Sequence, residues 1–175
     1  MNNLFNTVLI PPISIANAVI KFAQENFASN HMGYCLGSDG HLPHITLAQS
    51  TIDDKKTVKK LDAQICDLNW FGGNLIQFGE YYHHIDRGYC GISIHLSKAL
   101  KKIHGDIIKI HKNFNTKIHG NIGEDYWPHF TFAKTSHQII EPISLPSLLQ
   151  NQSNGWTLEF GHMGKHGVYL GRYKS

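Results

Sequence analysis

Two segments of the chain repeat one pattern, PHITLAQ at residues 43–49 and PHFTFAK at residues 128–134. Proline, histidine, threonine and alanine coincide in the two segments, and apolar residues fill the places between them. Because successive side chains of a strand point to opposite faces, each histidine projects with its threonine while the apolar residues project the other way. The chain thus builds the same two-faced strand twice, which predicts two related halves that face each other across a pseudo-twofold axis.

The rest of the chain alternates between expected strands and helices. Apolar alternation and short apolar runs predict strands at residues 4–10, 41–48, 74–82, 89–96, 127–133, 156–162 and 167–173. Apolar residues recur at helical spacing within residues 16–27, 58–68 and 100–114. This order is an α+β pattern, and no linker-like or low-complexity segment interrupts it. We therefore predict that residues 1–175 form a single domain.

The repeated faces direct four reactive side chains, those of His44, Thr46, His129 and Thr131, toward one expected cleft. Residues i and i+2 of a strand lie about 6.5–7 Å apart, so the hydroxyl can hold a phosphoryl oxygen while the ring reaches the attacking or leaving oxygen. One neutral imidazole can take a proton from water, and one imidazolium can give a proton to a departing sugar oxygen. The threonines would stabilise charge on the non-bridging oxygens. The pattern indicates phosphodiester chemistry that requires neither a metal nor a cofactor.

Composition and charge limit the other classes of function. With 16 Lys and Arg against 13 Asp and Glu, the formal net charge is +3, which permits an anionic ligand but falls short of a polybasic nucleic-acid coat. Three scattered cysteines without a C-x-x-C pair argue against a disulfide framework or a zinc ribbon. The first residues, MNNLFNTVLIPP, lack a basic region and a long apolar run, so we predict a cytoplasmic protein that does not span a membrane.

Two residues near the second segment are candidates for substrate contacts. Trp127 shares the strand face of His129 and is a candidate for base stacking, although a buried core tryptophan is the commoner outcome. Lys134 has the parity of Phe132, on the apolar face, so it reaches the cleft as a phosphate-binding residue only if the strand ends or bulges there. A solvated strand end is an equally good interpretation of Lys134.

The count of 13 histidines raises a metallohydrolase as an alternative. Adjacent His83 and His84 point to opposite sides of a strand and cannot bind one ion together, so we interpret both as exposed. His104 and His111 stand two helical turns apart, too far to share a metal ion. We predict no metal site, and we expect most remaining rings to be solvated. The basic stretch 98–112 is interpreted as the solvated face of an amphipathic helix in preference to an RNA track.

The two H-x-T motifs, in a chain of this length, resemble those of the two-histidine phosphoesterase superfamily, and within it the RNA 2′,3′-cyclic phosphodiesterases, also called 2′-5′ RNA ligases. The resemblance implies a bilobal fold in which each lobe is an antiparallel β-sheet flanked by helices, with the catalytic cleft between the lobes. It implies metal-independent cleavage of a 2′,3′-cyclic phosphate or a 2′-5′ linkage, with His129 activating water and His44 protonating the leaving group. Members often carry an arginine where Lys134 stands, and a lysine offers a point charge instead of a bidentate fork.

The favoured function is a monomeric phosphodiesterase acting on RNA ends or nucleotides that carry a 2′,3′-cyclic phosphate or a 2′-5′ linkage. The alternative is a non-catalytic module that binds an RNA end or a nucleotide in the same cleft. Binding alone has no need of two proton-transfer rings, so an intact histidine and threonine in both motifs favour the enzyme. The sequence leaves the physiological substrate open, because these compounds share one reacting centre.

Overall fold

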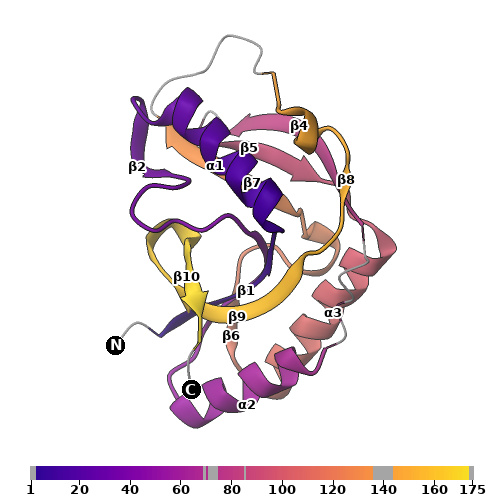
Figure 1. Cartoon of the computed structure of the whole chain (residues 1–175). Helices are drawn as coiled ribbons and strands as arrows, with labels where there is room; N and C mark the ends of the chain where they lie inside the picture. The colour runs from indigo at the N-terminus through magenta and orange to yellow at the C-terminus, as the bar shows by residue number, and fades with distance from the viewer. Residues whose placement is uncertain (1–2, 69, 71–74, 85, 136–143, 174–175) are drawn as a thin grey trace.

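Two antiparallel five-stranded sheets form the two lobes of the molecule (Figure 1). The structure is a computed structural model that describes residues 3–68, 70, 75–84, 86–135 and 144–173. The first sheet has the strand order β10 (Tyr169–Arg172), β9 (Thr157–Met163), β1 (Leu4–Ile10), β3 (Ile45–Thr51) and β6 (Lys117–His119). The second has the order β2 (His31–Cys35), β7 (His129–Thr135), β5 (Tyr89–Ile94), β4 (Ile76–His84) and β8 (Gln152–Ser153). The predicted α+β class with two antiparallel sheets flanked by helices is confirmed.

Three helices flank the sheets, each through an apolar stripe. Helix α1 (Ile13–Phe27) packs on β7 and β2 of the second sheet, whereas α2 (Lys55–Cys66) and α3 (Lys98–Asn113) pack on the first sheet (Figure 1). The ring of Phe132 on β7 lies 5.1 Å from that of Phe22 on α1, centroid to centroid. None of the helices in the described ranges is long and apolar enough to cross a membrane.

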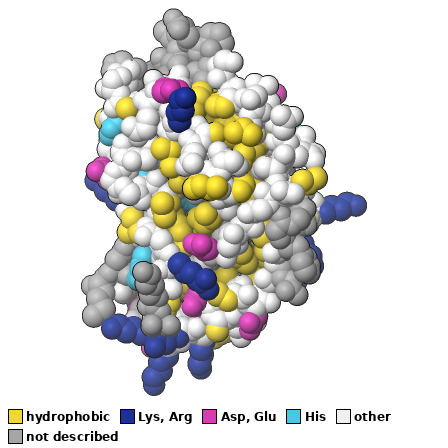
Figure 2. Space-filling view, in the orientation of Figure 1, with side chains coloured by type: hydrophobic (Ala, Val, Ile, Leu, Met, Phe, Trp, Pro, Cys, Tyr) yellow, Lys and Arg dark blue, Asp and Glu magenta, His cyan; other side chains and the backbone are white. Residues whose placement is uncertain are grey.

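The basic residues of α2 and α3 are solvated, as the helical pattern predicts. In the view of Figure 2 the Lys and Arg side chains gather at the lower end of the molecule, where α2 lies in Figure 1. The α3 lysines are exposed, and Lys102 and Lys109 both pair with Asp106 on their own helix. The charges of the α3 lysines therefore lie on the solvent-exposed surface of the helix.

Three strands were missed by the sequence prediction, β2, β6 and the two-residue β8. None of the strands expected from the sequence covers residues 31–35, 117–119 or 152–153. Strand β2 carries Gly33 at φ +73°, and β6 has only three residues, so neither shows an alternating apolar pattern. The two motif strands also begin later than predicted, at Ile45 and His129. His44 therefore directly precedes β3, and Trp127 lies two residues before β7.

Strand β3 carries a β-bulge inside the first motif. Thr46 pairs with Val8 and Ala48 pairs with Thr7, which leaves Leu47 as the extra residue. Paired residues on neighbouring strands project to the same face of a sheet. Ala48 therefore projects opposite to Thr46, and the next residue, Gln49, returns to the face of Thr46. The regular alternation of faces that the sequence predicts for this strand therefore ends at Leu47.

Strand β7 carries the same bulge at the same motif position. Thr131 pairs with Gly91 and Ala133 pairs with Cys90, so Phe132 is the extra residue. Lys134 pairs with Tyr89, which has the parity of Gly91, and Lys134 therefore projects on the face of Thr131. Lys134 was predicted to leave the apolar face only if the strand ends or bulges there, and the bulge of β7 meets this condition.

Two histidines of α3 are buried. His104 is 2% exposed and His111 is 0% exposed. His104 donates through Nδ1 to the carbonyl of Leu47 at 2.9 Å and accepts at Nε2 from the Gly123 amide at 3.2 Å. Both nitrogens of His104 are thus used by the neutral ring, which ties α3 to the bulge of β3.

Burial of His111 predicts that the protein loses stability in acid. Burial lowers the pKa of His111 to about 4, against about 6.5 in an unfolded chain. The neutral ring is favoured in the fold, so its contribution is complete above pH 6.5 and is lost as the pH falls toward 4. Between pH 7 and pH 4.5 we expect wild type to lose about 2–3 kcal/mol more unfolding free energy than His111→Gln, from urea unfolding at each pH. Equal losses in the two proteins would contradict this.

Candidate active site

The four side chains of the two motifs line one small cavity between the lobes. Its walls are formed by Tyr34, His44, Thr46, Gln49, His129, Thr131, Gly167 and Val168. Strand β3 with the residue before it contributes His44 and Thr46 from the first sheet, and β7 contributes His129 and Thr131 from the second. The cavity measures about 70 Å³, room for about five waters at roughly 10–15 Å³ each, or for a group the size of a phosphate.

Both rings are oriented by the same local hydrogen bond. His44 donates through Nδ1 to the carbonyl of Leu42 at 2.8 Å, and His129 donates through Nδ1 to the carbonyl of Trp127 at 3.0 Å. A carbonyl can only accept, so Nδ1 carries the proton in each neutral ring. Nε2 is then the nitrogen left with a lone pair, and it is the atom available for proton transfer.

Burial favours the neutral form of both rings. It lowers the pKa of His44 to about 4, a shift that the carbonyls of Leu42 and Gly167 oppose and that the nearby His129 ring reinforces. The pKa of His129 is also lowered by burial, against the opposing effect of the Trp127 carbonyl. An anion bound between the rings would favour the charged form of each and raise both pKa values.

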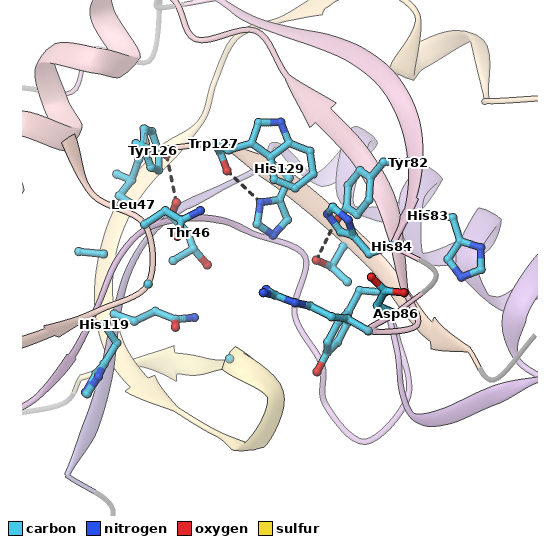
Figure 3. A pocket seen from close by; sticks show the side chains of 18 residues that line it. Thr46, Leu47, Tyr82, His83, His84, Asp86, His119, Tyr126, Trp127 and His129 are labelled. Carbon is cyan, nitrogen blue, oxygen red and sulfur yellow. Dashed lines mark hydrogen bonds between the residues drawn. The ribbon is translucent and has the colours of Figure 1, made fainter. Parts of the chain in front are cut away.

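Tyrosine hydroxyls hold the two threonine positions. The Tyr82 hydroxyl lies 3.2 Å from Oγ1 of Thr131, and the Tyr34 hydroxyl donates to the Thr131 carbonyl at 3.3 Å. The Tyr126 hydroxyl donates to the Thr46 carbonyl at 3.0 Å (Figure 3). Tyr126 in turn stacks on His104, with ring centroids 3.8 Å apart. These bonds fix the strands from which the reactive side chains project.

A larger groove of about 870 Å³ adjoins the small cavity and shares Thr46, Gln49, His129, Thr131 and Gly167 with it. Trp127 is 38% exposed at its wall and stacks on the His129 ring, with centroids 4.7 Å apart. The rings of Tyr82 and His84 meet Trp127 edge-on at 4.8 and 5.3 Å (Figure 3). The predicted alternative of a core tryptophan is therefore wrong, and Trp127 presents an open aromatic surface beside the reactive ring.

Lys134 and the His83-His84 pair differ in how they relate to the groove. The Lys134 ammonium lies 5.3 Å from the ring centroid of Tyr89, and the lysine lines neither cavity. His84 is exposed at the groove, and His83, which also lines it, is partly buried, with its Nε2 3.3 Å from Oγ1 of Thr135 (Figure 3). The prediction that both histidines are exposed holds for His84 and is wrong for the partly buried His83.

Sequence reasoning missed several polar residues that line the groove, among them Gln49, Tyr82 and Arg87. Gln49 occupies the place in the first motif that Lys134 occupies in the second, so the alignment of the two segments could have identified it once a bulge was assumed. Tyr82 and Arg87 come from β4 and the turn after it, and no local pattern relates them to the motifs. Among the described residues, no three His, Cys, Asp or Glu side chains gather closely enough to hold a metal ion.

No family model matches the chain, and no curated protein matches it. Escherichia coli LigT complexed with phosphate is similar over 95% of this chain and 90% of its own, with 12% identity and a TM-score of 0.64. E. coli LigT complexed with 3′-AMP covers 92% and 87%, with 13% identity and a TM-score of 0.63. The MHV ns2 PDE domain covers 89% and 87%, with 15% identity and a TM-score of 0.52. At these identities the comparisons show a shared fold: the predicted α+β arrangement of two antiparallel sheets flanked by helices is also that of E. coli LigT and the MHV ns2 PDE domain.

Proposed function

We propose that this chain is a two-histidine phosphoesterase that hydrolyses a 2′,3′-cyclic phosphate, or a 2′-5′ phosphodiester, at an RNA end or in a nucleotide. The observation that carries the proposal is the convergence of two His-Thr pairs, from different sheets, on one cavity the size of a phosphate group. Two imidazoles that are each oriented through Nδ1 can supply both proton transfers of a hydrolysis through Nε2, and the chemistry needs no metal.

The reaction follows from the two ring positions. Neutral Nε2 of one histidine takes a proton from water as the water oxygen bonds to phosphorus. The bond from phosphorus to one ribose oxygen breaks, and Nε2–H of the other, charged histidine gives its proton to that oxygen. Thr46 and Thr131 donate to the non-bridging oxygens as negative charge grows there. The product is a phosphate monoester beside a free ribose hydroxyl. The resemblance assigns the first step to His129 and the second to His44.

The groove next to His129 suits the nucleoside of such a substrate. Aromatic faces bind bases with about 1–3 kcal/mol per stacked base, and Trp127 is 38% exposed at the groove wall. E. coli LigT, which shares the fold, has been solved in complex with 3′-AMP, with ATP, with NADP+ and with phosphate. These ligands support a nucleotide as the class of substrate for this chain.

The direct test is turnover of a purine or pyrimidine nucleoside 2′,3′-cyclic phosphate by the purified protein in excess EDTA. We expect conversion to a nucleoside monophosphate, followed by chromatography, at a rate that the chelator does not change. Loss of activity with EDTA and its return with a divalent cation would favour a metallohydrolase. Tight binding of the cyclic nucleotide without conversion would favour the alternative, a module that binds an RNA end or a nucleotide in the same cleft.

The pH dependence of kcat/KM reports on the free enzyme, and the pH dependence of kcat reports on the enzyme with substrate bound. Turnover needs one neutral and one charged ring, so its pH profile is bell-shaped with apparent pKa values that belong to the pair. Both pKa values are lowered in the free protein, so we expect the maximum of kcat/KM below pH 6.5. The bound phosphodiester anion raises both, so the maximum of kcat should lie at higher pH. Steady-state kinetics from pH 4.5 to 8.5 measure both, and a kcat/KM maximum above pH 7.5 would contradict the assignment.

A further inference from the structure

The groove extends well beyond the histidine pair, to the turn between β4 and β5. Arg87 on this turn lines the same groove as His129 and Thr131. Two short bonds attach the turn to the strands around it: Gly88 donates from its amide to the His84 carbonyl at 2.7 Å, and Thr135 donates from its amide to the Gly88 carbonyl at 2.7 Å. The position of Arg87 relative to β7 is therefore fixed by backbone hydrogen bonds.

Arg87 is an exposed cation of this wall. Its side chain is exposed, and within the described ranges no residue makes an ion pair or a side-chain hydrogen bond with it. By contrast, the chain's other arginine, Arg172, donates to Sγ of Cys66 at 3.1 Å outside the groove. A guanidinium that faces a groove with all its donors unused is suited to bind a phosphate.

Arg87 lies on a turn further along β7 than the motif threonine. The turn joins β7 at Thr135, four residues beyond Thr131, and four residues of strand span at most about 13 Å. Arg87 lines the larger groove but not the small cavity that holds Thr46 and Thr131, so it belongs to the part of the groove outside that cavity. At about 870 Å³ the groove is near the upper end of the roughly 300–1,000 Å³ of small-ligand sites, which leaves room for a second phosphate.

We propose that Arg87 binds a second phosphate of the substrate, the one on the 5′ oxygen of the reacting nucleotide. In an RNA chain this group links the terminal nucleotide to its neighbour, and in a free nucleotide it is the 5′-phosphate. The inference rests on the proposed function for the first phosphate, and it names substrates with a 5′-phosphate as the preferred class. Asp86 lines the groove beside His84 and carries the opposing charge at this turn (Figure 3).

The test compares ligands that differ only in the 5′-phosphate. Affinities of adenosine 3′-phosphate and adenosine 3′,5′-bisphosphate are measured by calorimetry with wild type, Arg87→Ala and Arg172→Ala. We expect the bisphosphate to bind wild type about five- to tenfold more tightly, the range between an exposed ion pair and a charge-assisted contact in a groove. Arg87→Ala should reduce this ratio to less than twofold, and Arg172→Ala, which removes the same charge elsewhere, should retain it. Asp86→Asn should increase the ratio.

A wild-type ratio near one would overturn the inference, as would a ratio that Arg87→Ala leaves intact or that both arginine variants lose equally. Because binding is measured, this result stands whether or not the protein turns over cyclic phosphates, so a failure of the proposed function is seen separately. A second measurement distinguishes an RNA end from a free nucleotide as the molecule that carries this phosphate. It compares kcat/KM for adenosine 2′,3′-cyclic phosphate, its 5′-phosphorylated form and a dinucleotide that ends in the cyclic phosphate. A gain with the dinucleotide assigns RNA ends, and a gain confined to the 5′-phosphorylated form assigns free nucleotides.

Discussion

Alanine at His44 or at His129 is expected to lower kcat for a nucleoside 2′,3′-cyclic phosphate about 10²–10⁴-fold, the usual contribution of one general acid or base. Each ring lines the shared cavity and is held in place through Nδ1, so neither can replace the other's proton transfer without moving. The double variant should be only slightly slower than either single variant, because groups that act together lose their effect together. Single-turnover rates measure these differences.

His95→Ala is the matched control, because His95 is exposed and lines neither cavity. It should retain wild-type turnover, and all three variants should retain the circular dichroism and melting behaviour of a folded protein. A nucleoside 3′-(p-nitrophenyl) phosphodiester separates the roles, since its leaving group needs no proton. The variant that lacks the acid, His44→Ala by the resemblance, should regain most of its rate with this substrate, and the other should not. Near-wild-type turnover of the cyclic substrate by both single variants would refute the assignment.

Valine at Thr46 or Thr131 is expected to lower kcat about 10²–10³-fold, the usual cost of removing one donor to a developing oxyanion. Valine keeps the branched shape and the strand preference of threonine, so the loss measures the hydroxyl. At Thr131 the change also removes the partner of the buried Tyr82 hydroxyl, 3.2 Å away. Part of the loss at Thr131 should therefore be shared by Tyr82→Phe.

Thr157→Val provides the comparison for these variants, since Thr157 is exposed on β9 and lines neither cavity. The loss should fall mainly on kcat, because the hydroxyls act on charge that appears in the transition state. An increase in KM with unchanged kcat would assign the threonines to substrate binding alone. Steady-state kinetics with the cyclic nucleotide distinguish the two results.

The sequence was informative where a physical rule acts locally. The strand parity of His44 with Thr46, and of His129 with Thr131, follows from the alternation of side chains, and the structure brings all four to one cavity. The same rule failed at Leu47 and Phe132, because one extra residue in a strand reverses the parity of everything after it. Nothing in an apolar residue of such a strand distinguishes a bulge from regular pairing, so Gln49 was missed and Lys134 could be placed only conditionally.

The residues that form the walls of the groove could not be predicted from the sequence for a different reason. Tyr82, His84 and Arg87 approach β7 because β4 and β5 form a hairpin that packs beside it, and such pairing joins residues far apart in the sequence. The buried rings of His104 and His111 were also unexpected, since an amphipathic pattern counts histidine as polar. Their burial depends on partners distant in the sequence, the Leu47 carbonyl for His104 and the Thr7 hydroxyl for His111.

The order of strands in the first sheet has a consequence for fragments of this protein. Strand β1, near the beginning of the chain, lies between β3 and β9, and β9 comes from near its end. Helix α1 belongs to the first half but covers the sheet that holds the second motif. A protein cut between its two repeats should therefore give two pieces that are unfolded when separate and that regain structure when mixed. Although the motif is duplicated, we expect that neither half of the chain can be expressed, or can evolve, as an independently folding unit.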